Sequence, residues 1–176
     1  MGLLGIAVYA ASLAVAQDQP KAAPAEFMSR AAQYCLAEIQ IGEIAQKQAH
    51  SVEVADFATR RIDEYSKLLS DLKDLAGKEG VTLPTDLSLS SLNIQAELEG
   101  SPSSEAFDAL YMGAIRVFQR EQLSEFQAQT KYAKDTEVQS LAAKTMPMLK
   151  AAAASADRVD AMVEGHTTTA RPKTTG

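Results

Sequence analysis

The chain has 176 residues, a formal net charge of −6, one Cys and no Trp. This length suits one domain that can bury a core without disulfide support. No dense basic stretch interrupts the acidic balance, which excludes the phosphate-neutralising surface that nucleic-acid binding requires. Aromatic residues make up only 6% of the chain. Ala and Leu must therefore fill most of the core, which favours closely packed helices over a sheet.

The first 16 residues, MGLLGIAVYAASLAVA, contain no charged side chain and end in Ala14-Val15-Ala16. Small residues in this spacing are the pattern that signal peptidase cleaves. We expect residues 1–16 to be a signal peptide, cleaved near Ala16, and the mature chain to be exported, to the periplasm. The first charge is Asp18, whereas export signals normally begin with a basic region, so a retained N-terminal anchor stays open. No later stretch is apolar enough for a membrane span.

Residues 17–25 (QDQPKAAPA) mix Pro, Ala and polar residues, which is typical of a linker. Apolar residues at helical spacing then predict a first helix over residues 26–49. A second helix begins after Ser51, which can cap it, and ends at Gly80 before Pro84. The turn between the two helices is short.

Residues 82–102 are rich in Ser, Thr and Pro, with scattered Leu, and predict a crossover containing a short helix. A long helix follows over residues 103–133, with Phe107, Tyr111, Ile115, Phe118, Gln122 and Phe126 along one face. The last helix begins after Asp135-Thr136, and Pro147 is expected to kink it. Residues 165–176 are expected to be a disordered tail.

Two helix pairs joined by one long crossover predict an all-α protein, with a ferritin-like four-helix bundle over residues 26–164. Such bundles build metal sites from inward-facing Glu and His residues. Glu38 falls near the middle of the apolar face of the first helix, at ~100° per residue, and is the carboxylate that we expect to be buried. A polar cluster with Arg61, Tyr65 and Gln119 would satisfy it, because an unpaired charge in a core is costly. The alternative is a Glu38 exposed to a ligand cavity.

Other chemistry lacks its usual residues. The chain has no Glu-x-x-His pair, no Cys pair, no Gly-rich phosphate loop and no Gly-x-Ser-x-Gly motif. Its two His residues, His50 and His166, lie at the end of the first helix and in the expected tail. We predict no catalytic residue, no metal ligand and no cofactor. Cys35 is expected to be a small buried apolar side chain, with an intermolecular disulfide as the alternative.

Four blocks of the sequence resemble the bacterial domain-of-unknown-function family 4142, in the family's order: Ala37 to Ala49, Val54 to Pro84, Phe107 to Gln127 and Lys144 to Ala156. The resemblance implies a ferritin-like fold and an export signal, without an established activity. Similar chains typically place His residues where this chain has Tyr65, Gln119 and Ala152, together with the Glu at position 38. The resemblance therefore implies a divergent member in which the metal ligands are lost and the scaffold is kept.

These observations predict a non-catalytic exported bundle that binds a small ligand or an envelope protein. The competing hypothesis is a metal-binding or oxidoreductase bundle that uses Glu38. A third is an envelope structural or stress protein whose acidic faces keep it in solution.

Overall fold

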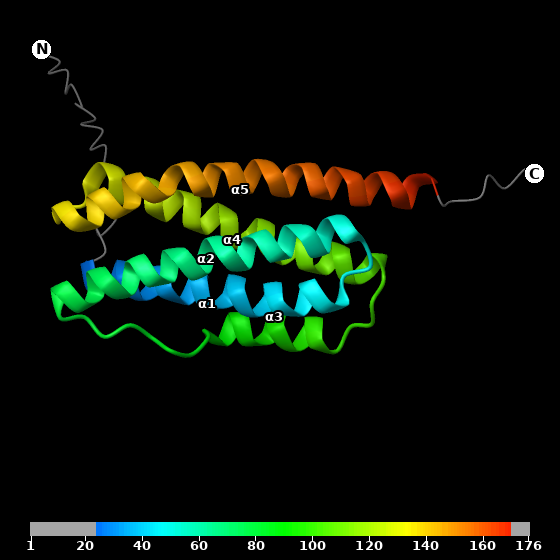
Figure 1. Ribbon diagram of the computed structural model, residues 1–176, viewed down its shortest axis with the longest axis horizontal. Coiled ribbons are helices and arrows are strands. Elements are labelled where there is room, and N and C mark those ends of the chain that lie inside the picture. The colour runs from blue at the N-terminus through cyan, green and yellow to red at the C-terminus, as the bar shows by residue number, and fades with distance from the viewer. Residues whose placement is uncertain (1–23, 170–176) are drawn as a thin grey trace, which may run out of the picture.

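The computed structural model describes residues 24–169. They form five helices and no strand: α1 (Pro24–Gln48), α2 (Val52–Glu79), α3 (Leu89–Glu99), α4 (Glu105–Tyr132) and α5 (Thr136–Thr169) (Figure 1). The predicted all-α class is confirmed, as is the long crossover between the second and third long helices. None of the described helices combines the length and the apolar character that a membrane crossing requires.

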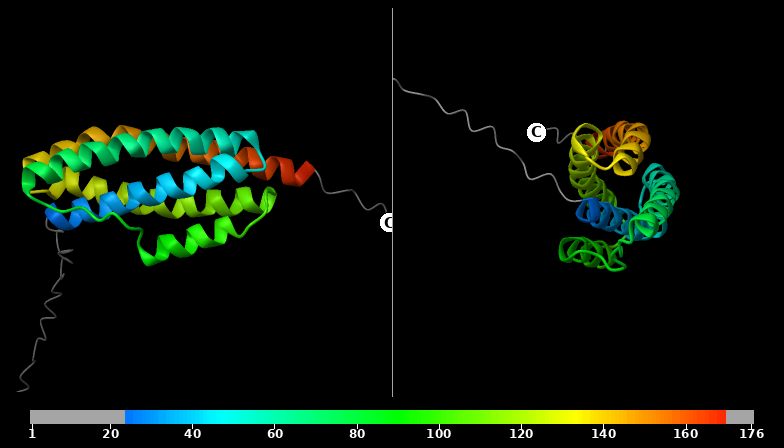
Figure 2. Two further views of the ribbon diagram at one scale, coloured as in Figure 1. Left: turned by 60° about the horizontal axis from the view of Figure 1, so that its bottom comes forward. Right: turned by 90° about the vertical axis from the view of Figure 1, so that its left-hand side faces the viewer.

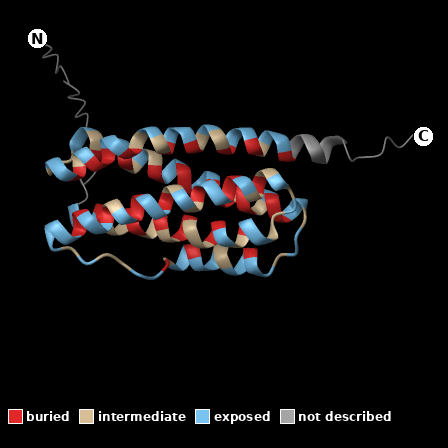
Figure 3. Cartoon of the chain, in the orientation of Figure 1, coloured by how far each residue is buried: buried red, intermediate tan, exposed pale blue. Residues whose placement is uncertain are grey.

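Four long helices enclose the core and α3 covers it from outside. α1 packs against α2 and α4, and α5 packs against α2 and α4, so the four close into a ring. α3, within the crossover, packs against α1 and α4. The end-on view in Figure 2 shows α3 outside the ring, next to α1. The buried residues follow the inward faces of the long helices (Figure 3).

Local sequence sets the helix ends. The Ser51 hydroxyl accepts a hydrogen bond from the Val54 N–H at 3.1 Å and begins α2, as predicted. Gly80 ends α2 in the left-handed conformation, at φ 66°, which a residue with a side chain adopts only at a cost. Ser104 caps α4 in the same way as Ser51 caps α2.

Some predicted boundaries differ from the observed ones. α1 begins at Pro24, inside the expected linker, because Pro is well suited to the first turn of a helix. α5 continues to Thr169 and so includes the first five residues of the expected tail, since a single Gly such as Gly165 weakens a helix by only about 1 kcal/mol. Pro147 lies within α5, and the helix continues past it. The expected signal peptide, residues 1–16, lies outside the described residues, as do most of the linker and the end of the tail.

The apolar core is divided into two clusters. On each long helix the members of one cluster precede those of the other. Near the boundary between the clusters lie Glu38 on α1, Arg61 on α2, Gln122 on α4 and Ala152 on α5. All four are buried. A layer that is polar on three helices therefore crosses the middle of the bundle, and we call these four positions, with Tyr65, the polar layer.

A second buried carboxylate ties α4 to the α1–α2 turn. Asp108 is 1% exposed, and its two oxygens accept hydrogen bonds from the backbone N–H groups of His50 and Ser51, both at 2.8 Å. These N–H groups lie where no helix supplies acceptors. Asp108 thus fixes the start of α4 against the turn that joins the first two helices.

Replacing Asp108 with Ala should lower the free energy of unfolding by about 3 kcal/mol, because two backbone N–H groups lose their acceptors inside the protein. Urea denaturation of the two proteins measures the difference. Asp74→Ala, on the exposed side of α2, is the control and should change stability by less than about 0.5 kcal/mol. Equal effects of the two substitutions would show that the Asp108 contacts do not hold the turn.

Candidate functional site

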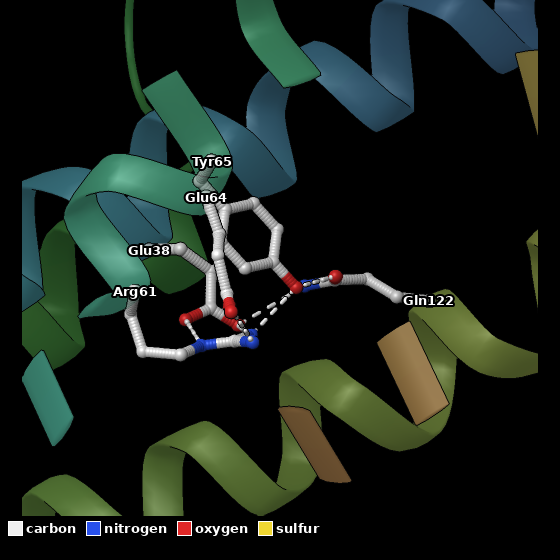
Figure 4. Close-up of polar contacts among 5 residues, drawn as sticks. All are labelled: Glu38, Arg61, Glu64, Tyr65 and Gln122. Atoms are coloured by element: carbon white, nitrogen blue, oxygen red, sulfur yellow. Dashed lines mark hydrogen bonds and ion pairs between the residues drawn. The ribbon is translucent and has the colours of Figure 1, made fainter. Parts of the chain in front are cut away.

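The polar layer contains a closed ring of hydrogen bonds from three helices (Figure 4). Arg61 on α2 donates to both carboxylate oxygens of Glu38 on α1, from Nη2 at 3.0 Å and from Nε at 3.4 Å. Arg61 Nη2 also donates to the Tyr65 hydroxyl at 2.6 Å. Tyr65 donates to Gln122 Oε1 on α4, and Gln122 Nε2 donates back to Glu38 Oε1 at 3.2 Å. Each of the four side chains therefore bonds two others in the ring.

The helical spacing of α2 places Arg61 beside two aromatic side chains and a second carboxylate. Arg61 and Tyr65 are one helical turn apart, so their side chains share a face of α2. The Arg61 guanidinium carbon lies 4.3 Å from the centre of the Tyr65 ring and 5.8 Å from that of Phe57, distances at which a cation is attracted to an aromatic face. Glu64, at the edge of the layer, accepts from Arg61 Nη1 at 3.3 Å. Arg61 thus links the interior to the surface.

Burial raises the pKa of the Glu38 carboxyl, and the charge and hydrogen bonds of Arg61 oppose this rise. Burial alone would lower the pKa of Arg61, but the charge of Glu38, the interaction with Tyr65, the hydrogen bonds to Glu38 and the charge of Glu64 together outweigh it, and the net direction is upward. The two directions compete, since a higher pKa favours the neutral acid of Glu38 whereas Arg61 needs a carboxylate. Three N–H donors point at the Glu38 oxygens, and donors to a carboxylate favour its charged form. We therefore describe Glu38 and Arg61 as an ion pair.

Burial, followed by the charge of Glu38, raises the pKa of Tyr65 well above its usual 10.0. Tyr65 remains a neutral hydroxyl that can both accept from Arg61 and donate to Gln122. The same two causes raise the pKa of the Cys35 thiol, which is buried and free. Because the thiolate is the reactive form of cysteine, Cys35 acts in the structure as an apolar core side chain, as the sequence predicted.

The structure brings three of the four expected cluster residues together, namely Glu38, Arg61 and Tyr65. The fourth, Gln119, is buried at 6% exposure, but its Nε2 has no hydrogen-bond partner among the described residues. Gln122, one turn further along α4, makes the contacts instead. Gln122 lies on the predicted inward face of the helix, but helical spacing alone does not separate it from Gln119, which lies on the same face.

Two polar groups of α4 stand apart from the ring. The Tyr111 hydroxyl is fully buried and, like Gln119 Nε2, finds no hydrogen-bond partner in the described part of the chain. Burial raises the pKa of Tyr111, and the charge of Glu38 adds to the rise. The charge of Glu38 therefore affects the pKa of Tyr111, although no hydrogen bond among the described residues joins the Tyr111 hydroxyl to the polar layer.

The described part of the chain gathers few carboxylate and imidazole groups in the interior. Among the described side chains, which end at residue 163, no three His, Cys, Asp or Glu come close enough together to hold a metal ion. His50 is exposed at the end of α1, and the side chain of His166 lies outside the described part. The cation that faces Glu38 is the guanidinium of Arg61, which repels a second cation at the same oxygens.

The fold and the site define a helical bundle with an ion pair at its centre. The model of a family described as a domain of unknown function (DUF4142) matches residues 10–159, and the chain belongs to that family. No significant match was found among the curated proteins or the solved structures. The positions at which the family resemblance implies His residues, Tyr65, Gln119 and Ala152, are all buried.

Replacing Glu38 with Ala should lower the free energy of unfolding by about 3 kcal/mol, because the Arg61 charge stays buried without its main partner. Arg61→Met leaves the Glu38 carboxyl in an apolar site and should also destabilise the protein. The double variant should lose less than the sum of the two single losses, since neither charge then remains. Urea denaturation of the four proteins gives the coupling free energy.

The matched control is Glu43→Ala, an exposed carboxylate on the same helix, which should change the free energy of unfolding by less than about 0.5 kcal/mol. Additive effects of Glu38→Ala and Arg61→Met, each below about 1 kcal/mol, would contradict the ion pair.

Proposed function

We propose that this chain is an exported helical scaffold that binds an envelope protein or a small ligand and carries out no chemistry in its interior. The observation that supports the proposal is that Arg61 already binds both carboxylate oxygens of Glu38, from Nη2 at 3.0 Å and from Nε at 3.4 Å. A ligand or metal at Glu38 would have to displace a guanidinium that has no other buried carboxylate in the ring. Such a site is better suited to a structural role than to a catalytic one.

The first test concerns metal. The full chain, washed with a chelator and dialysed, should contain iron, zinc and manganese well below one atom per chain by elemental analysis, since hard or borderline cations need carboxylate or imidazole ligands free of a competing cation. Added zinc or iron should leave the melting temperature unchanged. About one or more metal atoms per chain after this treatment would instead support the alternative, a metal-binding or oxidoreductase bundle using Glu38.

The second test concerns export. The Ala14-Val15-Ala16 pattern supports cleavage before Gln17 and release into the periplasm. N-terminal sequencing and intact mass of protein expressed with its own first residues should give a chain beginning at or near Gln17 in the periplasmic fraction. An uncleaved chain in the membrane fraction would favour the anchor, and Ala16→Phe, which blocks a small-residue cleavage site, serves as the comparison.

A further inference from the structure

The outer side of α3 carries apolar side chains that no other described segment covers. Leu89 is 82% exposed and Leu92 is 45% exposed. On the opposite side of the same helix Leu98 is fully buried in the core. A surface helix is usually apolar on one side only, whereas α3 has leucines on its exposed side as well as on its buried side.

This exposed side continues into a groove between α3 and α1. The groove has a volume of about 580 Å³, and its apolar lining comes from α1: Leu36, Ile39 and Ile44. Gln95 and Glu99 line it from α3, joined by a hydrogen bond of 2.9 Å. At ~100° and ~1.5 Å per residue, Leu92 lies on the same side of α3 as Glu99, ~10 Å before it along the helix, and Leu89 lies one turn before Leu92. The exposed leucines and the groove therefore form one surface, which we call the α1/α3 face.

Most charged residues of this region are acidic. Between Lys78 and Arg116 the sequence contains no Lys, Arg or His, but it contains Glu79, Asp86, Glu97, Glu99 and Glu105, besides the buried Asp108. Glu43 from α1 and Glu99 from α3 are exposed at the groove, with Lys47 as its basic residue. Gln48 Oε1, also in the lining, is a buried acceptor that finds no partner in the described part of the structure. Unused acceptors and carboxylates both favour a partner that brings N–H donors and positive charge.

We propose that the α1/α3 face docks a basic amphipathic helix of a partner protein. Its apolar side chains would cover Leu89, Leu92 and the floor of the groove, as helices do in apolar grooves. Its Lys or Arg residues would face Glu43 and Glu99. A second copy of this chain is a poorer occupant, because two acidic faces would repel each other. The proposal rests on the proposed function, since it names the partner class of a scaffold that works through its outer surface.

The test uses a labelled synthetic peptide of about five helical turns, built from Leu and Lys with the leucines on one face, and the full chain. Fluorescence anisotropy should show saturable binding, and the Glu-for-Lys peptide should not bind. The double variant Leu89→Ser/Leu92→Ser should bind the Lys peptide at least about tenfold more weakly, since burial of the leucines is lost. Glu99→Lys should weaken binding by a similar factor.

Two variants separate this site from general attraction between a cationic peptide and an acidic protein. Val117→Ser removes a side chain of α4 that is 46% exposed, and Asp74→Lys makes the same change in net charge as Glu99→Lys. Both should keep the wild-type affinity within about twofold, with melting temperatures showing that every variant is folded. No saturable binding, or equal losses in these controls, would overturn the docking site. So would a dimer of the chain, seen by analytical ultracentrifugation, that Leu89→Ser/Leu92→Ser dissociates. None of these results contradicts the proposed scaffold function, which the metal and export tests decide.

Discussion

A buried ion pair between Glu38 and Arg61 is the constraint on which the arrangement of the helices depends. Removing each charge from water costs several kcal/mol, and the attraction between the two repays this only when the remaining hydrogen-bonding groups are also satisfied. Tyr65 and Gln122 meet that condition by closing the ring. Because its members come from α1, α2 and α4, the ring forms only when the three helices have one relative rotation and one register. Apolar packing by Ala and Leu on either side is less selective, since such surfaces can slide.

The same ring shows how an inward Glu is satisfied by a side chain of the protein itself. In di-metal helical bundles, inward carboxylates surround a cation between the helices. Here the cation is the Arg61 guanidinium, a planar group whose donors match the two oxygens of Glu38. Ala152 on α5 contributes no polar atom to the layer, so the hydrogen bonds lie on the α1, α2 and α4 side of the bundle. Because the Arg61 guanidinium belongs to the chain, a chelator cannot remove it, and this cation is a permanent part of the folded protein.

The sequence predicted the fold class, the long crossover and most helix ends, because these depend on local spacing and on caps such as Ser51 and Gly80. It also placed Glu38 and Arg61 on facing inward stripes. It did not distinguish Gln119 from Gln122. The two differ by three residues, which is only about 60° around the helix and ~4.5 Å along it, and both fall within one inward arc. The choice depends on how α4 is shifted against α1, which is a property of the packed bundle.

Asp108 was missed for a different reason. An acidic residue in the first turn of a helix is ordinarily explained by the helix dipole and by solvent, and nothing in the local pattern points to the α1–α2 turn, which lies more than fifty positions earlier in the chain. Its role arises from the ring of helices, which brings the start of α4 to that turn. Side-chain acceptors that bind backbone N–H groups far away in the sequence leave no periodic signal in a single sequence.

The crossover carries more chain than the topology requires. α2 and α4 each have 28 residues, so a connection between opposite ends of the bundle must span ~42 Å at ~1.5 Å per residue. An extended chain covers that distance in about 13 residues, whereas the connection from Gly80 to Ser104 has 25 residues. The additional residues form α3, whose inner side covers α1 and α4 and whose outer leucines contribute little to folding because they stay in water. The ion pair of Glu38 and Arg61 fills the centre of this bundle. The crossover residues that are not needed to connect α2 to α4 form α3, which lies outside the ring of long helices, over α1.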